Sequence, residues 1–434
     1  MKHFICLLLC LYFIPAVFAQ QKSPIVTSDI PLFWKTYDVV TRISDSSQQA
    51  ALFQEMYINK GSAGLIAMME ARRYTIADYL TAFKNYPEFW KSMRPNMMKA
   101  DKYAAEIQQG ITAFRKIYPA KPATIYFTVG AMRSNGTTQA DKVLIGAEIA
   151  MADSSVVTTE LSPRFEHLKS FFKTNPIKDI VFLNVHEYVH TQQKSTIGDY
   201  LLTQCVLEGV AEFVAVKSMG IPSPNPPIAY GKANDAALKL AFSKCMFTPF
   251  TDNWLYNNTK NPFGMRDLGY YMGYALCEKY YEQAKDKKAA IKSMIELDYN
   301  NDTLLYRFVD SSHYFAYPIA ALKAAYEASR PGVTGISGLD KRFDGKVAPG
   351  KKTITIQFSQ PLDPRFRNFE IGPAGEASLM KVQKVIGFTT NTSALIVEAD
   401  LQPNKHYQLV IGEEFRTKES IPLKKYLIDI QTGE

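Results

Sequence analysis

The group of side chains best suited to chemistry is the run His186-Glu187-Tyr188-Val189-His190. It lies in an apolar-periodic stretch that predicts a helix, in which residues four apart share one face. The two imidazoles can therefore point at one metal ion, with Glu187 beside them as a carboxylate able to take a proton. This spacing indicates hydrolysis by a metal-activated water.

A third metal ligand must lie elsewhere, because a catalytic zinc ion takes three protein ligands and keeps one position open for water. Metzincins have a Gly three residues after the second His ligand and supply the third ligand as a His six residues after it. In this chain Gln193 stands at the Gly position and Thr196 at the His position. Farther on, Glu208 lies on a second predicted helix, on one face with Cys205 and Glu212. A carboxylate on this second helix can complete the tetrahedral ligand set.

The motifs on these two predicted helices resemble those of gluzincins, the group of zinc peptidases that contains thermolysin and aminopeptidase N. Glu208 follows His190 by 18 positions and stands in Glu-Gly-Val-Ala, close to the Asn-Glu-Gly-Phe-Ala of the aminopeptidase branch. The resemblance implies a zincin-type fold and Zn²⁺ as the cofactor, with His186, His190 and Glu208 as its ligands. It also implies Glu187 as the general base.

Two supporting roles follow from the same resemblance. Thermolysin-like members place an acidic residue one turn after the ligand Glu, where it hydrogen-bonds a ligand His, and Glu212 holds that position. The aminopeptidase branch places a transition-state Tyr farther downstream, which points to Tyr270 or Tyr271. The alternatives are an ordinary salt-bridged carboxylate for Glu212 and core aromatics for the two tyrosines.

The chemistry these residues imply is hydrolysis of a peptide or protein substrate. Gly130-Ala131-Met132 matches the start of an amine-anchoring motif of aminopeptidases, but Arg133 replaces its Glu, so an endopeptidase is favoured. We expect residues 144–149 to form the sheet edge that holds the peptide. Two alternatives remain: a catalytically inactive gluzincin-fold scaffold or adhesion protein of the cell envelope, and a zinc hydrolase acting on another bond.

Periodicity predicts the elements that position this site. Residues 20–120 read as a helical leading segment, and residues 121–330 as the gluzincin-like peptidase domain. Within that domain, strands are expected over 124–129 and 143–149, joined by a turn at Ser134-Asn135-Gly136, with helices from about residue 178 onward. Residues 29–38, the Tyr-Pro pair at 118–119 and the Tyr-Tyr-Met-Gly-Tyr run at 270–274 also resemble uncharacterised zinc proteases among the secreted proteins of bacteria.

Residues 331–434 change to a period of two and predict an all-β sandwich after a linker at 330–335. This part resembles the bacterial Ig-like domains appended to many secreted proteins, which implies a partner on the cell envelope or surface. The expected class is thus α+β: a mainly helical zincin-type domain with a small sheet, then an Ig-like sandwich. Its strands are expected over 353–358, 393–397, 407–411 and 426–430.

The N-terminus predicts export. Residues 1–19 combine a basic start, a short apolar stretch and a small residue at Ala19, which is typical of a signal peptide cut after that residue. The protein is then secreted or periplasmic. The net charge of +8 is spread along the chain, which argues against nucleic acid as a partner. After cleavage only Cys205, Cys245 and Cys277 remain, too few for a disulfide framework.

Overall fold

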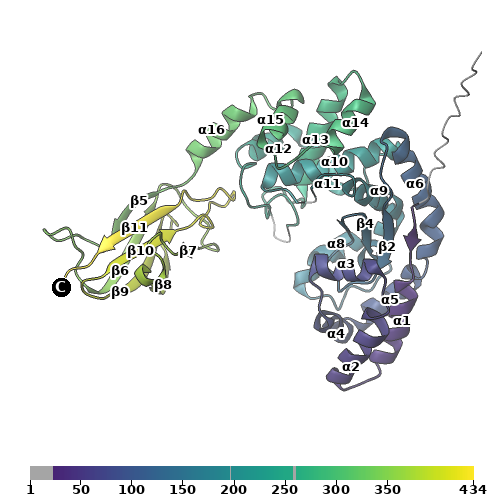
Figure 1. Ribbon diagram of the computed structural model, residues 1–434, viewed down its shortest axis with the longest axis horizontal. Coiled ribbons are helices and arrows are strands. Elements are labelled where there is room, and N and C mark those ends of the chain that lie inside the picture. The colour runs from purple at the N-terminus through teal and green to yellow at the C-terminus, as the bar shows by residue number, and fades with distance from the viewer. Residues whose placement is uncertain (1–22, 196, 258–260) are drawn as a thin grey trace, which may run out of the picture. The chain divides into compact units, whose positions relative to one another are not determined.

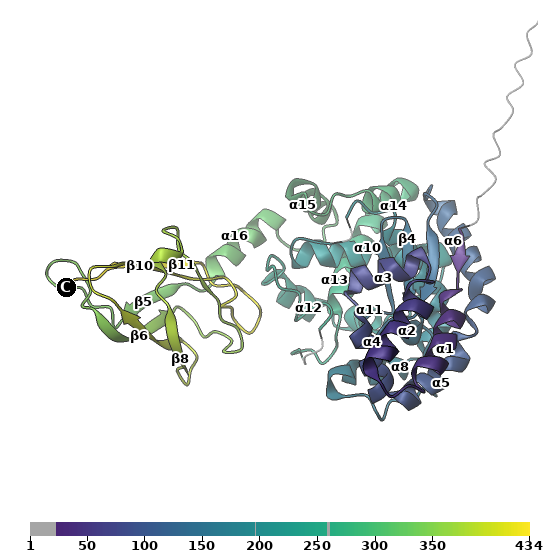
Figure 2. The ribbon, with the colours of Figure 1, turned by 60° about the horizontal axis from the view of Figure 1, so that its bottom comes forward.

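The structure is a computed structural model that describes residues 23–195, 197–257 and 261–434 (Figure 1; a second view is Figure 2). The expected signal peptide and its cleavage after Ala19 lie outside these residues. Among the helices of the described residues, none is both long and apolar enough to cross a membrane.

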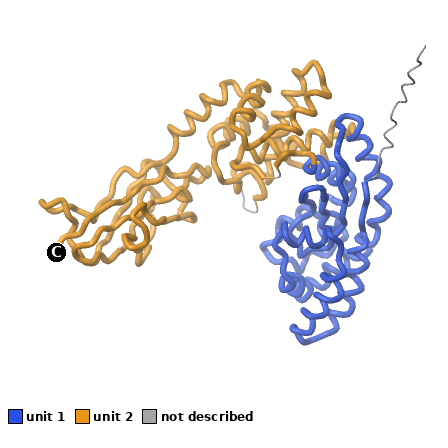
Figure 3. Tube along the Cα trace, viewed as in Figure 1, with its two compact units in different colours: residues 1–191 blue, residues 192–434 orange. Residues whose placement is uncertain are grey.

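Helices outweigh strands, and several small sheets accompany them, so the expected α+β class is confirmed. By its internal contacts the chain divides into two compact units, residues 1–191 and 192–434 (Figure 3). The two units are described in turn.

After a two-residue strand at Ile25–Val26, unit 1 continues with helices up to Ile117, as the periodicity predicts. Asp45, Ser62 and Thr75 each accept a backbone N–H of the helix that follows, which satisfies donors that a helix start leaves open. The apolar faces share a core of aromatic rings, in which the centroids of Phe33 and Trp90 lie 5.2 Å apart. The elements are α1 (Asp29–Val40), α2 (Ser46–Phe53), a π-helical turn (Gln54–Ile58), α3 (Ala63–Arg72), α4 (Ile76–Asn85), α5 (Pro87–Met97), a 3-10 turn (Ala100–Tyr103) and α6 (Ala104–Ile117).

A four-stranded sheet follows, in the order β1-β2-β4-β3. β2 is parallel to both β1 and β4, whereas β3 is antiparallel to β4. The strands are β1 (Ile25–Val26), β2 (Thr124–Thr128), β3 (Gly136–Gln139) and β4 (Lys142–Gly146). The rest of unit 1 is helical: α7 (Ala147–Ala150), a 3-10 turn (Pro163–Phe165), α8 (Glu166–Phe172), a second 3-10 turn (Pro176–Asp179) and α9 (Ile180–His190).

Three expectations about this sheet are wrong. The strand expected over 143–149 ends at Gly146, because the next residues form α7. The turn at 134–136 leads into β3 and does not join β2 to β4, since parallel strands need a longer crossover than a tight turn. β4 lies between β2 and β3, so the edge expected at 144–149 is formed instead by β3.

α3 and α9 cover opposite faces of this sheet. A Cβ on Gly64 of α3 would lie 2.1 Å from the ring of Tyr126, and one on Gly136 would lie 2.5 Å from Oε1 of Glu187 on α9. Through the strand pairing, Gly136 shares its face with Phe127, the neighbour of Tyr126. Since successive strand residues point to opposite faces, the two helices lie on opposite sides. Both close approaches require glycine.

The first part of unit 2 is a set of helices around the crossing of α10 and α13. A Cβ on Gly209 would lie 2.1 Å from the backbone of Gly273, and one on Gly273 would lie 1.7 Å from the carbonyl oxygen of Cys205. The two helices therefore meet backbone to backbone. They are α10 (Leu201–Met219), α11 (Pro226–Ala233), α12 (Asp235–Ser243), α13 (Leu268–Gln283), α14 (Lys287–Ile295), α15 (Asp302–Ser311) and α16 (Ile319–Ser329).

The second part of unit 2 is all β, as the period of two predicts. Two antiparallel sheets, in the orders β5-β6-β9-β8 and β11-β10-β7, enclose one apolar core, and Figure 2 shows them as two layers. Residues 333–335 of the expected linker belong to a strand, which corrects that boundary. The elements are β5 (Val333–Ser337), β6 (Gly350–Phe358), β7 (Phe369–Glu370), a 3-10 turn (Glu376–Ser378), β8 (Val382–Phe388), β9 (Ala394–Leu401), β10 (His406–Ile411) and β11 (Tyr426–Gln431).

Candidate metal centre

The helix α9 carries the run His186 to His190 and places its histidines and glutamate in the interior of the protein. His186, Glu187 and His190 are each less than a tenth exposed. Another buried side chain of this helix is Tyr188, whose hydroxyl donates to the carbonyl oxygen of Lys121 at 3.1 Å and accepts from the backbone N–H of Ala123 at 3.0 Å. This hydroxyl ties α9 to the chain just before β2.

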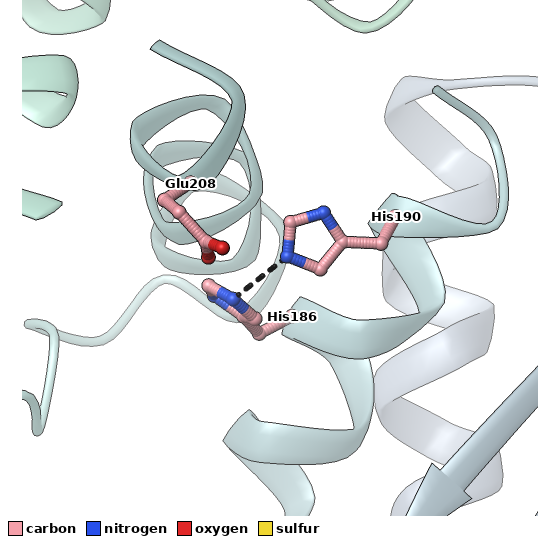
Figure 4. Close-up of side chains that lie close together, drawn as sticks. All are labelled: His186, His190 and Glu208. Atoms are coloured by element: carbon pink, nitrogen blue, oxygen red, sulfur yellow. Dashed lines mark hydrogen bonds between the residues drawn. The ribbon is translucent and has the colours of Figure 1, made fainter. Parts of the chain in front are cut away.

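His186, His190 and Glu208 form a buried group that could hold a metal ion (Figure 4). Each offers one ligand atom, and these atoms all lie within 4.8 Å of one another. The Nε2 atoms of the two histidines are 3.1 Å apart. Two ligands about 2.05 Å from one tetrahedral ion are separated by about 3.3 Å, so the pair has the spacing of shared metal ligands. Two imidazoles and one carboxylate also match the donor set of catalytic zinc sites.

Glu208 is held within α10 and from the loop before α13. Its Oε1 accepts a hydrogen bond from Nε2 of Gln204 at 3.2 Å and one from the hydroxyl of Tyr256 at 2.5 Å. Gln204 Nε2 also donates to the Tyr256 hydroxyl at 3.0 Å, and its Oε1 accepts from the backbone N–H of Gly198 at 2.7 Å. These bonds orient the carboxylate.

Tyr256 is a functional candidate that the sequence analysis did not identify. Its φ of +54° is a left-handed conformation, and its backbone N–H donates to Oδ1 of Asp267 at 2.6 Å. Burial raises the pKa of Asp267, whose own N–H donates to Asn257. The tyrosine is 51% exposed, whereas the carboxylate of Glu208, which its hydroxyl contacts, is buried. A phenol in this position can donate a hydrogen bond to a bound substrate oxygen.

The sequence offered a signal for one of these two residues. Gln204 stands four residues before Glu208 and shares its helix face, so helical spacing alone could have found it. Tyr256 stands in an irregular loop, where spacing carries no information about direction.

The other expected site residues lie on α10 and α13. Glu212, one turn after Glu208, is buried and accepts a hydrogen bond from the Ser223 hydroxyl. The Tyr271 hydroxyl donates to Oδ1 of Asp235 at 2.7 Å, which gives that residue a structural partner. Tyr270 is half-buried on α13. The supporting role of Glu212 and the catalytic role of either tyrosine stay predictions.

A buried carboxyl positions the loop that leads into β3. Glu148 of α7 accepts the backbone N–H groups of Gly130 and Met132 at 3.0 and 3.1 Å. Burial raises the pKa of Glu148 to about 7, against the opposing effect of these hydrogen bonds. Arg133, the next residue, forms an ion pair with Asp78 at 2.6 Å. The loop is therefore set by polar side chains before the strand begins at Gly136.

Comparison with known proteins assigns this chain to no family. No protein family matches the chain, and neither does any curated protein. The similar solved structures include the S-layer protein SbsC, with 11% identity and a TM-score of 0.18 over 94% of this chain and 45% of that one. An N-terminal part of the bacterial SbsC has 12% identity and a TM-score of 0.16 over 94% of this chain and 77% of that one. Similarity at this level supports no inference about this chain.

Proposed function

We propose that the protein is a secreted, zinc-dependent endopeptidase. The observation that carries the proposal is the buried group of His186, His190 and Glu208, with Glu187 on the same helix as the two histidines. This donor set leaves one tetrahedral position for a water or a substrate oxygen. The proposal includes a zincin-type arrangement for residues 121–330 and an Ig-like one for residues 331–434.

Bound zinc would supply an activated water and polarise the substrate carbonyl. Glu187 would accept the proton of the attacking water and return it to the leaving amine, which is general base and then general acid catalysis by one carboxylate. Its burial beside Gly136 keeps it at one position, because the glycine lets the strand approach the carboxylate without a side chain between them.

The edge strand β3 would hold the substrate. It ends the order β1-β2-β4-β3, so an extended peptide could add to it by backbone hydrogen bonds. Gly136 at its start lies against Glu187, which would bring such a peptide to the catalytic carboxylate. β3 thereby takes the role first assigned to residues 144–149.

The Tyr256 hydroxyl would turn its single proton from Glu208 to the substrate carbonyl oxygen as negative charge develops on that oxygen. Its contact with Glu208 is the support for this assignment. Tyr270 and Tyr271 stay alternatives for the same role.

The test is cleavage of a broad peptide library by the purified mature chain carrying one zinc, beside Glu187→Gln. We expect internal cleavage by the wild type and a loss on the order of 10³-fold in the variant, since general acid and base groups contribute 10² to 10⁴. A zinc-loaded wild type that cleaves no peptide would overturn the proposal. In that case, an unchanged cellular phenotype of Glu187→Gln would favour the envelope scaffold.

A further inference from the structure

The loop that carries Tyr256 is bound by the C-terminal sheets. We call residues 246–257 the site loop and residues 413–423 the sheet turn, which lies between β10 and β11. Both belong to unit 2. The contacts between them are polar and specific, and each can be removed by a single substitution.

Arg416 of the sheet turn is the main contact. Its guanidinium carbon lies 3.8 Å from the ring centroid of Phe250 in the site loop and 3.5 Å from that of Phe366. It also forms an ion pair with Asp252 at 3.3 Å, and only 7% of its side chain is exposed. A planar cation stacked between two rings and paired with a carboxylate fixes both position and direction, which a lysine could not do.

Two hydrogen-bonding residues of the site loop reach the same turn. The Thr248 hydroxyl donates to the carbonyl oxygen of Ser420 at 2.5 Å, and both residues are buried. Nδ2 of Asn253 donates to the carbonyl oxygen of Lys418 and to the hydroxyl of Ser420, each at 3.0 Å. Four residues of the site loop therefore contact the sheet turn: Thr248, Phe250, Asp252 and Asn253.

A short rigid connection leads from these points to Tyr256. The backbone N–H groups of Trp254 and Leu255 both donate to the carbonyl oxygen of Thr251 at 2.8 Å, which closes a helical turn. Trp254 and Leu255 are buried. A shift of the loop at Asp252 or Asn253 would thus be passed to Tyr256, where a displacement of about 1 Å is enough to lower a rate strongly.

We propose that the C-terminal sheets are a positioning element of the metal centre. Arg416 and its hydrogen-bonding neighbours hold the site loop so that the Tyr256 hydroxyl stays against Glu208. The inference rests on the proposed peptidase function and deepens it, because it makes the sheets part of the catalytic unit and not only an attachment to the cell envelope. Arg416 is a positioning residue, since it acts through Tyr256.

A double-mutant cycle on peptide cleavage tests the coupling. We expect Tyr256→Phe to lower kcat on the order of 10²-fold, and Arg416→Ala to lower it about tenfold with little change in KM. The double variant should be no slower than Tyr256→Phe alone, because Arg416 affects kcat only through the Tyr256 hydroxyl, which that substitution has already removed. Losses that multiply in the double variant would overturn the proposal, since a general structural defect acts independently of Tyr256.

The matched control is Lys425→Ala. Lys425 forms an ion pair with Glu370 at 2.9 Å within the same sheets, and neither residue lies in the sheet turn or the site loop. It should leave kcat unchanged. Arg416→Lys keeps the charge toward Asp252 but loses the stacking, so its kcat should fall between those of the wild type and Arg416→Ala.

Hydrogen exchange separates this inference from the proposed function, because it needs no activity. Backbone amides of the site loop should exchange faster in Arg416→Ala than in the wild type, with those of α10 and α13 unchanged. Unchanged exchange in the site loop would reject the coupling even in an active enzyme. If Arg416→Ala does not fold, Asn253→Ala replaces it and should show the same direction with a smaller change.

Discussion

The residues of the candidate site are held in two different ways. Glu208 lies on a helix whose crossing with α13 is fixed by Gly209 and Gly273, where backbone meets backbone without side chains between. Tyr256 lies on a loop that backbone hydrogen bonds join to α10 and α13, and that side-chain hydrogen bonds and one stacked cation join to residues 413–423. The loop before β3 is likewise held by a side chain, because the carboxylate of Glu148 accepts two of its backbone N–H groups.

This difference has a functional consequence. Packed backbones offer few alternative arrangements, so the proposed ligand on α10 is fixed wherever the fold is intact. Loops held by polar side chains can open at a cost of a few hydrogen bonds. We therefore expect changes in helix packing to affect the whole fold, and changes in loop contacts to affect one loop.

The largest expected effect comes from breaking the helix crossing. Gly273→Ala would place a Cβ 1.7 Å from the carbonyl oxygen of Cys205, so α10 and α13 must separate. We expect the free energy of unfolding to fall on the order of 4 kcal/mol, measured by urea denaturation. Gly332→Ala is the control, since its Cβ would meet nothing within 4 Å. Equal stabilities of the two variants would contradict this account.

The second largest effect is expected on the pH dependence of stability, through Glu148, which holds the loop before β3. An acid with a pKa of 4.5 when unfolded and about 7 when folded binds its proton more tightly in the folded state. The contribution of Glu148 to stability is therefore most favourable below pH 4.5 and falls as the pH rises through about 7, by about 3 kcal/mol in total.

Glu148→Gln should remove this dependence, because an amide does not ionise in that range. Urea denaturation between pH 5 and pH 8 should show the wild type losing stability relative to the variant as the pH rises. Glu106→Gln, at an exposed position, serves as the control. Parallel pH profiles of wild type and Glu148→Gln would show that the buried carboxyl is not the cause.

A smaller effect is expected where one hydroxyl supports a packed helix. Tyr188→Phe keeps the ring of α9 in the core but leaves the N–H of Ala123 without its acceptor. We expect a loss of about 2 kcal/mol in the free energy of unfolding, with metal binding retained because packing still holds the helix. Loss of the metal in this folded variant would show that α9 depends on polar contacts as the loops do.

The sequence predicted the parts of this molecule that depend on local spacing. The spacing of His186 and His190, and the resemblance that added Glu208, predicted a group whose ligand atoms lie within 4.8 Å of one another. Their role as metal ligands stays a prediction. The period of two likewise predicted β6, β9, β10 and β11, but not β5, β7 or β8. Each of these successful predictions rests on spacing within one helix or strand, which needs no knowledge of distant neighbours.

What depends on neighbours distant in sequence was missed. The edge strand was assigned to residues 144–149, although strand order places β3 there, because alternation within a strand does not reveal which strands lie beside it. Tyr256 was missed because its direction is set by a left-handed backbone and by Asp267. Gly209 and Gly273 are visible in the sequence, but only the structure shows that both are needed at the crossing of α10 and α13.

The most direct test of the central claim is the metal content of the purified protein, measured by elemental analysis for the wild type, Glu187→Gln and Glu208→Ala. We predict one zinc per chain in the wild type and in Glu187→Gln, whose side chain is not a ligand in our assignment, and little or none in Glu208→Ala. A wild type that stays free of zinc after reconstitution, or a Glu208→Ala variant that binds zinc as tightly as the wild type, would contradict the assignment of His186, His190 and Glu208 as a zinc site.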